Sequence, residues 1–217
     1  MFTLMCLSVV TAIAQEVNST GSTTSGIPVY TVDSEKSVFR ILVGREGLLA
    51  RMGHNHVIVS HNISGTIHFN TPPLPSTAQL KIPVDSLVVD DPAERQRAGA
   101  GYESIPTEKD KQGTRSNMLR PEVLDAQQFP EIRIEAVIDG NNPDPRQMAI
   151  TLYFKGQQIG LNLPATLSIN NGRMLVEARF NLEHQQLGLR PFTALGGALR
   201  VANTIGFELR LEATTNK

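Results

Sequence analysis

The chain has 217 residues, a formal net charge of −1 at pH 7, few aromatic residues and no tryptophan. This length fits one all-β domain, and a net charge near zero gives no broad field that would attract nucleic acid or acidic lipid. The scarcity of aromatic side chains argues against base-stacking surfaces and against the aromatic girdles of an outer-membrane barrel.

The N-terminal segment has the pattern of an export signal. Residues 2–14 are apolar or small, and Ala12-Ile13-Ala14 provides a small-x-small cleavage site. The run is too short to span a bilayer, so it predicts a signal peptide over residues 1–14 and no membrane span after cleavage. Cys6, the only cysteine, lies inside it, and an exported chain without disulfides favours a bacterial periplasm. Residues 15–27 are rich in Ser, Thr and Asn and predict a flexible leader.

Residues 28–217 are expected to form one β-barrel domain, beginning with strands at Val29–Val32 and Ser37–Arg45. Between Val57 and Phe69 apolar and polar residues then alternate, which is the period of a β-strand with one dry face. We expect one long strand here, whose dry face carries the apolar residues of one parity, namely Val57, Val59, Ile63, Ile67 and Phe69.

The middle of the chain predicts two short helices. Residues 91–112 are charged, and Pro92 after Asp91 is typical of the first turn of a helix. A second short helix is expected over residues 118–128, ended by Pro130. Neither segment has enough apolar surface for a core of its own, so both are excursions between strands.

Strand alternation resumes after Pro130 and continues almost to the C-terminus. Lys155-Gly156 and Asn170-Asn171-Gly172 predict tight hairpin turns between the later strands. In all, the sequence predicts about eight strands, which form one long antiparallel sheet. Such a sheet hides its apolar face by closing on itself, and an eight-stranded barrel encloses either packed side chains or one slender ligand.

Residues 119–132, LRPEVLDAQQFPEI, resemble the segment that marks the YceI-like family. Tyr30–Asp33 and Ser64–Phe69 are similar to two of its early strands, and the resemblance covers roughly residues 29–213. It implies an extended lipocalin-like antiparallel barrel, exported to the periplasm, whose tunnel holds a long isoprenoid or similar amphipathic lipid. In this chain Arg45-Glu46-Gly47-Leu48-Leu49 replaces the His-Leu-Gly stretch of many members, which leaves the usual ligand open.

Two sets of residues are candidates for ligand contacts. Apolar side chains expected to face the interior would line a lipid tunnel if the barrel is wide and would be plain core if it is narrow: Val57, Val59, Ile63, Ile134, Leu161, Leu163, Phe180 and Phe207. Polar side chains expected near the barrel mouth could contact a headgroup: Arg40, Arg45, Arg51, His54, His56 and His61. We expect His61 to point into the barrel.

The sequence therefore predicts a non-enzymatic periplasmic binding protein for an isoprenoid or quinone-type lipid, with no cofactor other than that lipid. No Gly-x-Ser-x-Gly motif or phosphate-binding loop is present. One alternative is a metal- or haem-binding stress protein that uses His54 and His56, about 7 Å apart if both are extended. Another is an interaction module that docks a membrane partner through residues 91–112. Assembly as a homodimer is left open.

Overall fold

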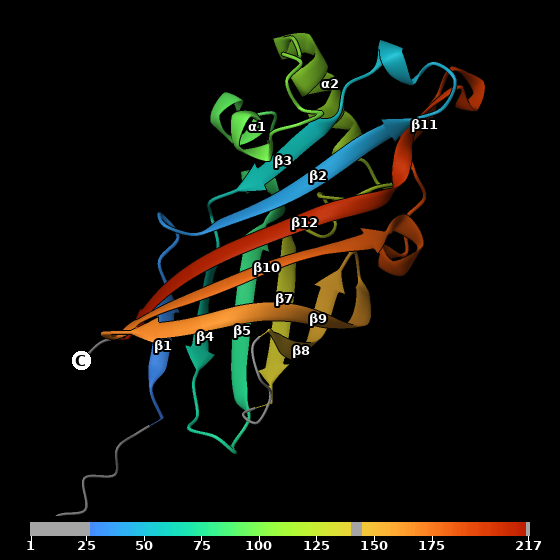
Figure 1. Cartoon of the computed structure of the whole chain (residues 1–217). Helices are drawn as coiled ribbons and strands as arrows, with labels where there is room; N and C mark the ends of the chain where they lie inside the picture. Colours follow the sequence, from blue (N-terminus) through green and yellow to red (C-terminus); the bar gives the residue numbers. More distant parts are fainter. Residues whose placement is uncertain (1–26, 140–144, 216–217) are drawn as a thin grey trace, which may run out of the picture.

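The computed structural model describes residues 27–139 and 145–215 (Figure 1). The predicted signal peptide and nearly all of the predicted leader lie outside the described residues. The strands are β1 (Val29–Val32), β2 (Val38–Glu46), β3 (His56–Ser60), β4 (Ser64–His68), β5 (Ser76–Pro83), β6 (Val88–Val89), β7 (Glu131–Ile138), β8 (Arg146–Phe154), β9 (Gln157–Asn170), β10 (Arg173–Glu183), β11 (Thr193–Ala194) and β12 (Leu199–Thr215). The helices are α1 (Pro92–Ala98) and α2 (Glu108–Met118), and the short 3-10 turns are η1 (Ala50–Met52), η2 (Val84–Ser86), η3 (His184–Leu187) and η4 (Leu195–Gly197).

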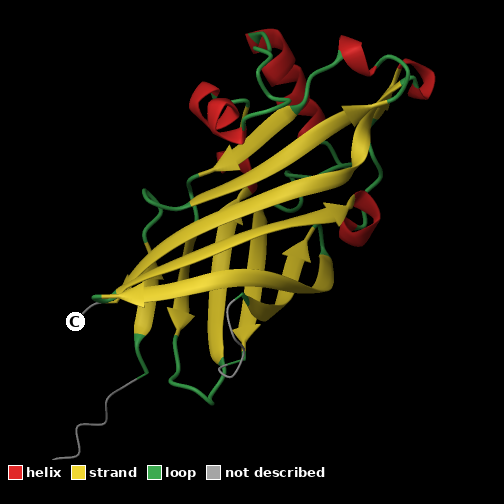
Figure 2. Cartoon of the chain, viewed as in Figure 1, coloured by secondary structure: helices red, strands yellow, loops and turns green. Residues whose placement is uncertain are grey.

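The strands form one closed antiparallel barrel. In hydrogen-bonded order the ring runs β1, β4, β5, β7, β8, β9, β10 and β12, and β12 pairs again with β1. Along the rest of its length β12 pairs with β2, which continues the wall through β3 and β6. The helices gather at the upper end of the barrel in Figure 2. The predicted all-β antiparallel barrel of about eight strands with short helices is therefore confirmed.

Every second side chain of a strand faces the interior of the barrel, as the strand period requires. In β10 and β12 the inward positions face each other across the register, and Phe180 lies opposite Phe207 with ring centroids 5.2 Å apart. Burying one such large apolar side chain contributes about 1.5–3 kcal/mol. Removal of this stripe from water is therefore what closes the sheet.

Both predicted hairpin turns are present. Asn171 and Gly172 adopt φ of 49° and 73°, and Lys155 and Gly156 adopt 50° and 71°. Two successive positive φ values define the type I′ turn, whose twist matches that of the flanking strands.

The predicted single strand from Val57 to Phe69 is wrong: the chain forms β3 and β4, with a break at residues 61–63. At the break the inward-facing positions change from even-numbered to odd-numbered residues: Ile58 faces the interior before the break, and Ile63 faces it after the break. Val57 and Val59 are also buried, but on the outer face of β3, against which α1 packs.

The two helices differ in how well they were predicted. Helix α1 begins as expected, since the Asp91 carboxylate accepts hydrogen bonds from the backbone N–H groups of Ala93 and Glu94. The second helix was expected over residues 118–128, but α2 lies before that segment, at Glu108–Met118. It begins at a capping box of Thr107 and Asp110 and ends at Met118. Residues 119–129 are turns because Pro121 disfavours helix before it and Asp125 has a positive φ of 48°.

No helix among the described residues is long and apolar enough to cross a membrane.

Candidate functional site

The barrel interior contains two adjoining cavities. The helix-end cavity has a volume of about 300 Å³ and the barrel cavity about 130 Å³. They share wall residues in the middle of the barrel, namely Phe39, Ile134, Leu152, Leu187 and Phe207. The two cavities therefore adjoin along the barrel.

The barrel cavity is apolar throughout. Every described residue that lines it is aliphatic, aromatic, methionine or proline, and the strands from β4 round to β12 contribute to its wall. An unpaired polar group would lose its hydrogen bonds with water here, so this part suits a hydrocarbon chain.

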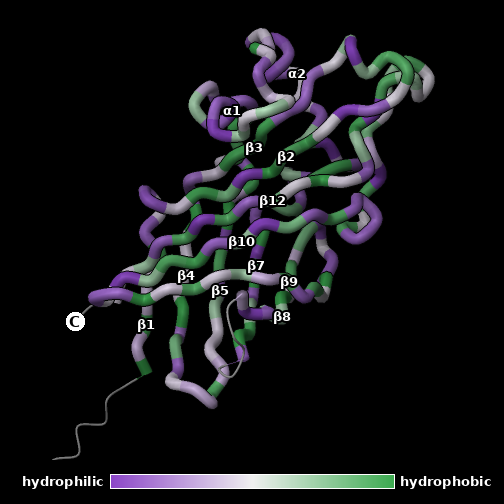
Figure 3. The backbone as a smooth tube through the Cα atoms, viewed as in Figure 1, coloured by the Kyte–Doolittle hydropathy of each residue, from purple (hydrophilic) through white to green (hydrophobic). Residues whose placement is uncertain are grey.

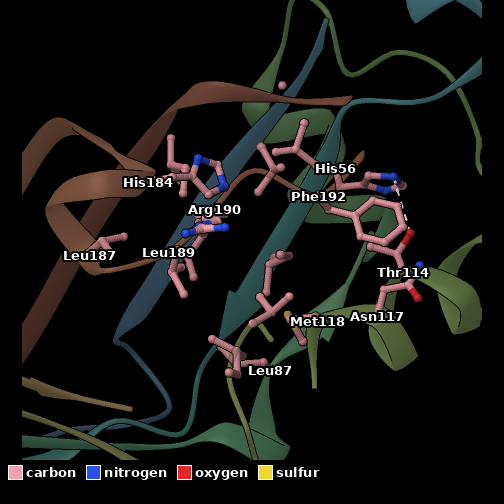
Figure 4. A pocket seen from close by; sticks show the side chains of 18 of the residues that line it. His56, Leu87, Thr114, Asn117, Met118, His184, Leu187, Leu189, Arg190 and Phe192 are labelled. Carbon is pink, nitrogen blue, oxygen red and sulfur yellow. Dashed lines mark hydrogen bonds between the residues drawn. The ribbon is translucent and has the colours of Figure 1, made fainter. Parts of the chain in front are cut away.

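The helix-end cavity carries polar side chains on two sides of an otherwise apolar wall (Figure 4). They are Arg45, His54, His56, Thr114, Asn117, His184, Arg190 and Arg200. No Asp or Glu is among the described residues that line it. The cavity wall is thus rich in hydrogen-bond donors and positive charge, which favours a ligand group that accepts hydrogen bonds or carries negative charge.

His56 is held in one orientation by a buried carboxylate. Its Nδ1 lies 2.6 Å from Asp90 Oδ2, and its Nε2 lies 3.4 Å from the Thr114 hydroxyl. Because a carboxylate can only accept, Nδ1 carries the proton that is donated, and in the neutral ring Nε2 is an acceptor on the cavity side. The Asp90–His56–Thr114 order is that of hydrolase triads, but 3.4 Å exceeds the spacing of a nucleophile and its base and favours simple hydrogen bonding.

Asp90 is itself fully buried and fixed by several donors. Its Oδ1 accepts from Val57 N–H at 2.9 Å and from the Arg95 guanidinium at 2.5 Å. Burial alone would raise the pKa of Asp90, but the hydrogen bonds from His56, Val57 and Arg95 outweigh it and hold the pKa below its ordinary value. Asp90 is therefore ionised at neutral pH and anchors this side of the cavity.

His184 faces the same cavity from the other side (Figure 4). It is buried, and its Nδ1 donates to the Asn203 carbonyl oxygen at 2.9 Å. As in His56, this bond fixes the tautomer, so that Nε2 of the neutral ring is the acceptor.

The structure brings together six of the eight predicted tunnel residues. Ile134 and Phe207 line both cavities, and the barrel cavity adds Ile63, Leu161, Leu163 and Phe180. Val57 and Val59 line neither cavity. Ile58 takes their place, because neighbouring residues of a strand point to opposite faces. Contact of any of these residues with a ligand stays a prediction.

Of the predicted rim residues, Arg45, His54 and His56 line the helix-end cavity. Arg40 lies outside the barrel, where it forms ion pairs with Glu94 of α1 and with Glu208. The side chain of His61 is 54% exposed and does not point into the barrel, because it lies in the break between β3 and β4. Arg51 lies in η1 and is exposed.

The metal or haem alternative gains no third ligand from the geometry. The rings of His54 and His56 have centroids 6.3 Å apart, and Nδ1 of His56 is already engaged by Asp90. Over residues 27–139 and 145–215, no group of three or more His, Cys, Asp or Glu side chains could hold a metal ion. Metal binding by this pair stays a prediction without structural support.

Five wall residues were not predicted from the sequence, namely Thr114, Asn117, His184, Arg190 and Arg200. Thr114 and Asn117 are three residues apart on one face of α2, a pattern that predicting the helix at residues 108–118 would have revealed. Arg190 and Arg200 belong to an irregular stretch and the strand after it, where sequence alone gives no orientation.

These features define the class: a closed antiparallel barrel with an internal apolar cavity and, at one end, an adjoining cavity whose wall carries basic and amide groups. The sequence model of the YceI-like domain matches residues 30–213, and the chain therefore belongs to this family. The resemblance noted in the sequence is confirmed.

Solved structures with the same fold include BcnA from Burkholderia cenocepacia, with a TM-score of 0.60, 14% sequence identity and coverage of 84% of this chain and 99% of that chain. A polyisoprenoid binding domain from Saccharophagus degradans, implicated in plant cell wall breakdown, has a TM-score of 0.55 at 12% identity, with coverage of 86% and 98%. At these identities the likeness concerns the fold. A search of curated protein sequences gave no significant match.

Proposed function

We propose that this protein binds a long isoprenoid-type lipid inside the barrel and does not transform it. The observation that carries the proposal is the division of the barrel interior into a wholly apolar cavity and an adjoining cavity with basic and amide groups. Family membership supports an apolar isoprenoid ligand as the class.

The two cavities suggest how the ligand lies. The hydrocarbon tail occupies the barrel cavity, where each buried methylene contributes about 0.8 kcal/mol. The headgroup lies in the helix-end cavity, where the Arg190 guanidinium and the Asn117 amide can donate hydrogen bonds to a phosphate or a quinone carbonyl.

The test is to block the barrel cavity without touching the outer surface. Ala178 is buried and lines this cavity, while its neighbour Arg179 has a side chain that is 82% exposed. We expect Ala178→Trp to abolish uptake of a polyprenyl lipid, measured by mass spectrometry of the washed complex, and the matched control Arg179→Trp to retain it. Uptake that is equal in both variants, with both folded, would contradict binding inside the barrel.

We also propose that the protein is exported to the periplasm. The apolar run over residues 2–14 and its cleavage site support this proposal. Cell fractionation and the N-terminal sequence of the native protein test it, and full-length protein in the cytoplasmic fraction would contradict it.

A further inference from the structure

Two loops next to the helix-end cavity expose large apolar side chains. Leu48, Leu49 and Met52 lie in or beside η1, and Phe192 and Leu195 lie beside or in η4; we call these five residues the apolar rim patch. Leu48 is 96% exposed, Met52 68% and Leu195 60%. Single exposed apolar residues are ordinary, but a group of them marks an interaction site.

The two loops form one surface. The backbone N–H of Leu49 donates to the Ala198 carbonyl at 2.9 Å, so the chain after β2 is tied to the chain before β12. Both loops lie at the upper right of the barrel in Figure 1, and Figure 3 colours parts of them as hydrophobic.

The patch is continuous with the cavity. Phe192 belongs to the patch and also lines the helix-end cavity. Gly53 of the first loop and Ala194 of the second line the same cavity without belonging to the patch. A lipid that left the cavity on this side would therefore meet the patch.

The two loops that carry the patch have a net positive charge. Residues 44–53 and 189–201 contain Arg45, Arg51, Arg190 and Arg200, and their only acidic residue is Glu46, which pairs with Arg200. The whole chain has a net charge of −1, so this is a local concentration. Exposed apolar side chains flanked by arginine are the features of a surface that lies on an anionic bilayer. A symmetric contact between two copies would instead place the arginines opposite one another.

We propose that the apolar rim patch docks the protein on an anionic lipid bilayer, with the cavity beside the membrane surface. Exchange of the bound lipid between the docked protein and the bilayer rests on the proposed function. Docking on the bilayer does not depend on the proposed function.

The experiment is flotation of the full-length mature protein with vesicles of phosphatidylglycerol and phosphatidylcholine in equal amounts, compared with vesicles of phosphatidylcholine alone. We expect binding to the anionic vesicles that weakens at high salt. The triple variant Leu48→Ser, Met52→Ser, Leu195→Ser should bind roughly a hundredfold more weakly, since it removes three large side chains from the membrane contact. The control triple variant Leu74→Ser, Ile105→Ser, Val137→Ser changes exposed apolar residues elsewhere and should bind like wild type.

A second pair of variants tests the charge. Arg51→Glu should weaken binding to the anionic vesicles, whereas Arg173→Glu, at the far end of β10, should not (Figure 1).

Three results would overturn the proposal. The first is wild-type protein that carries lipid in its barrel but does not float with anionic vesicles, which would leave the proposed function intact. The second is equal loss of binding in the two triple variants. The third is a wild-type dimer, seen by light scattering, that the patch variant alone abolishes, which would make the patch an interface between copies.

Discussion

Asp90 shows how much one residue decides in this barrel. Acidic residues beside a proline are typical of turns, and Asp90 has a positive φ of 57° between β6 and α1. Yet its side chain is fully buried and holds both His56 at the cavity wall and Arg95 of α1. The attachment of α1 through Arg95, the edge of β3 and the orientation of a cavity histidine therefore depend on one carboxylate.

Replacing this carboxylate should destabilise the fold. Asp90→Asn removes the partner of the buried Arg95 charge, and breaking a buried pair on one side costs about 3–5 kcal/mol. Urea unfolding measures the change. The matched control Glu177→Gln breaks the exposed pair with Arg210 and should cost less than about 1 kcal/mol. Equal effects of the two substitutions would contradict the role assigned to Asp90.

The same variant has a defined pH dependence. The pKa of Asp90 is lowered in the folded protein, so its contribution to stability is present above the unfolded pKa of about 3.9 and is lost as the pH falls through the folded value. The difference in free energy of unfolding between wild type and Asp90→Asn should therefore shrink below about pH 4. Other carboxyl groups with a lowered pKa are present in both proteins, so their contributions cancel in the difference between the two free energies of unfolding. A difference that stays constant down to acid unfolding would contradict this assignment.

Arg190 tests the headgroup. It lines the helix-end cavity and has no hydrogen-bond or ion-pair partner among the described residues. Its guanidinium is therefore available to a phosphate, and a charge-assisted hydrogen bond contributes about 1.5–3 kcal/mol. Arg190→Gln should weaken binding of a polyprenyl phosphate by roughly ten- to a hundredfold and leave the matching polyprenol almost unchanged. Arg179→Gln on the outer surface is the control, and equal losses for phosphate and polyprenol would contradict the headgroup position.

At the scale of elements, the turns and the alternating strands are what sequence predicts best. Strands β7 to β10 and the later part of β12 follow the expected alternation, and the Lys155-Gly156 and Asn171-Gly172 turns fix the pairing of β8 with β9 and of β9 with β10. The inversion between β3 and β4 was not predictable from alternation, because it depends on α1 covering Val57 and Val59 from outside. Burial of both faces of β3 makes outer and inner apolar residues look alike in the sequence.

The two type I′ turns allow a matched comparison. Gly156→Ala and Gly172→Ala impose the same strain of a positive φ, which costs about 1–2 kcal/mol. A Cβ at residue 156 would in addition lie 2.8 Å from the Phe129 ring, whereas at residue 172 the nearest atom is a Thr215 methyl at 3.3 Å. Thermal unfolding should therefore show the larger loss for Gly156→Ala. The reverse order would contradict the packing of Phe129 on this turn.

At the scale of the whole molecule, the fold could be predicted from the sequence and the detail of the site only in part. Alternation and a long apolar face required closure of the sheet, and the resemblance supplied the family. Wall residues such as His184 and Arg190 were missed because they follow β10 in a stretch without periodicity. Which side chains meet at the end of a barrel depends on how distant loops close, and that is a property of the complete chain.

A lipid held in the barrel can be detected by mass spectrometry of an organic extract of the native protein purified without detergent. We expect one isoprenoid-type lipid in stoichiometric amount, retained through washing and absent from an Ala178→Trp preparation. A folded wild-type protein whose extract contains no lipid would contradict the proposed function.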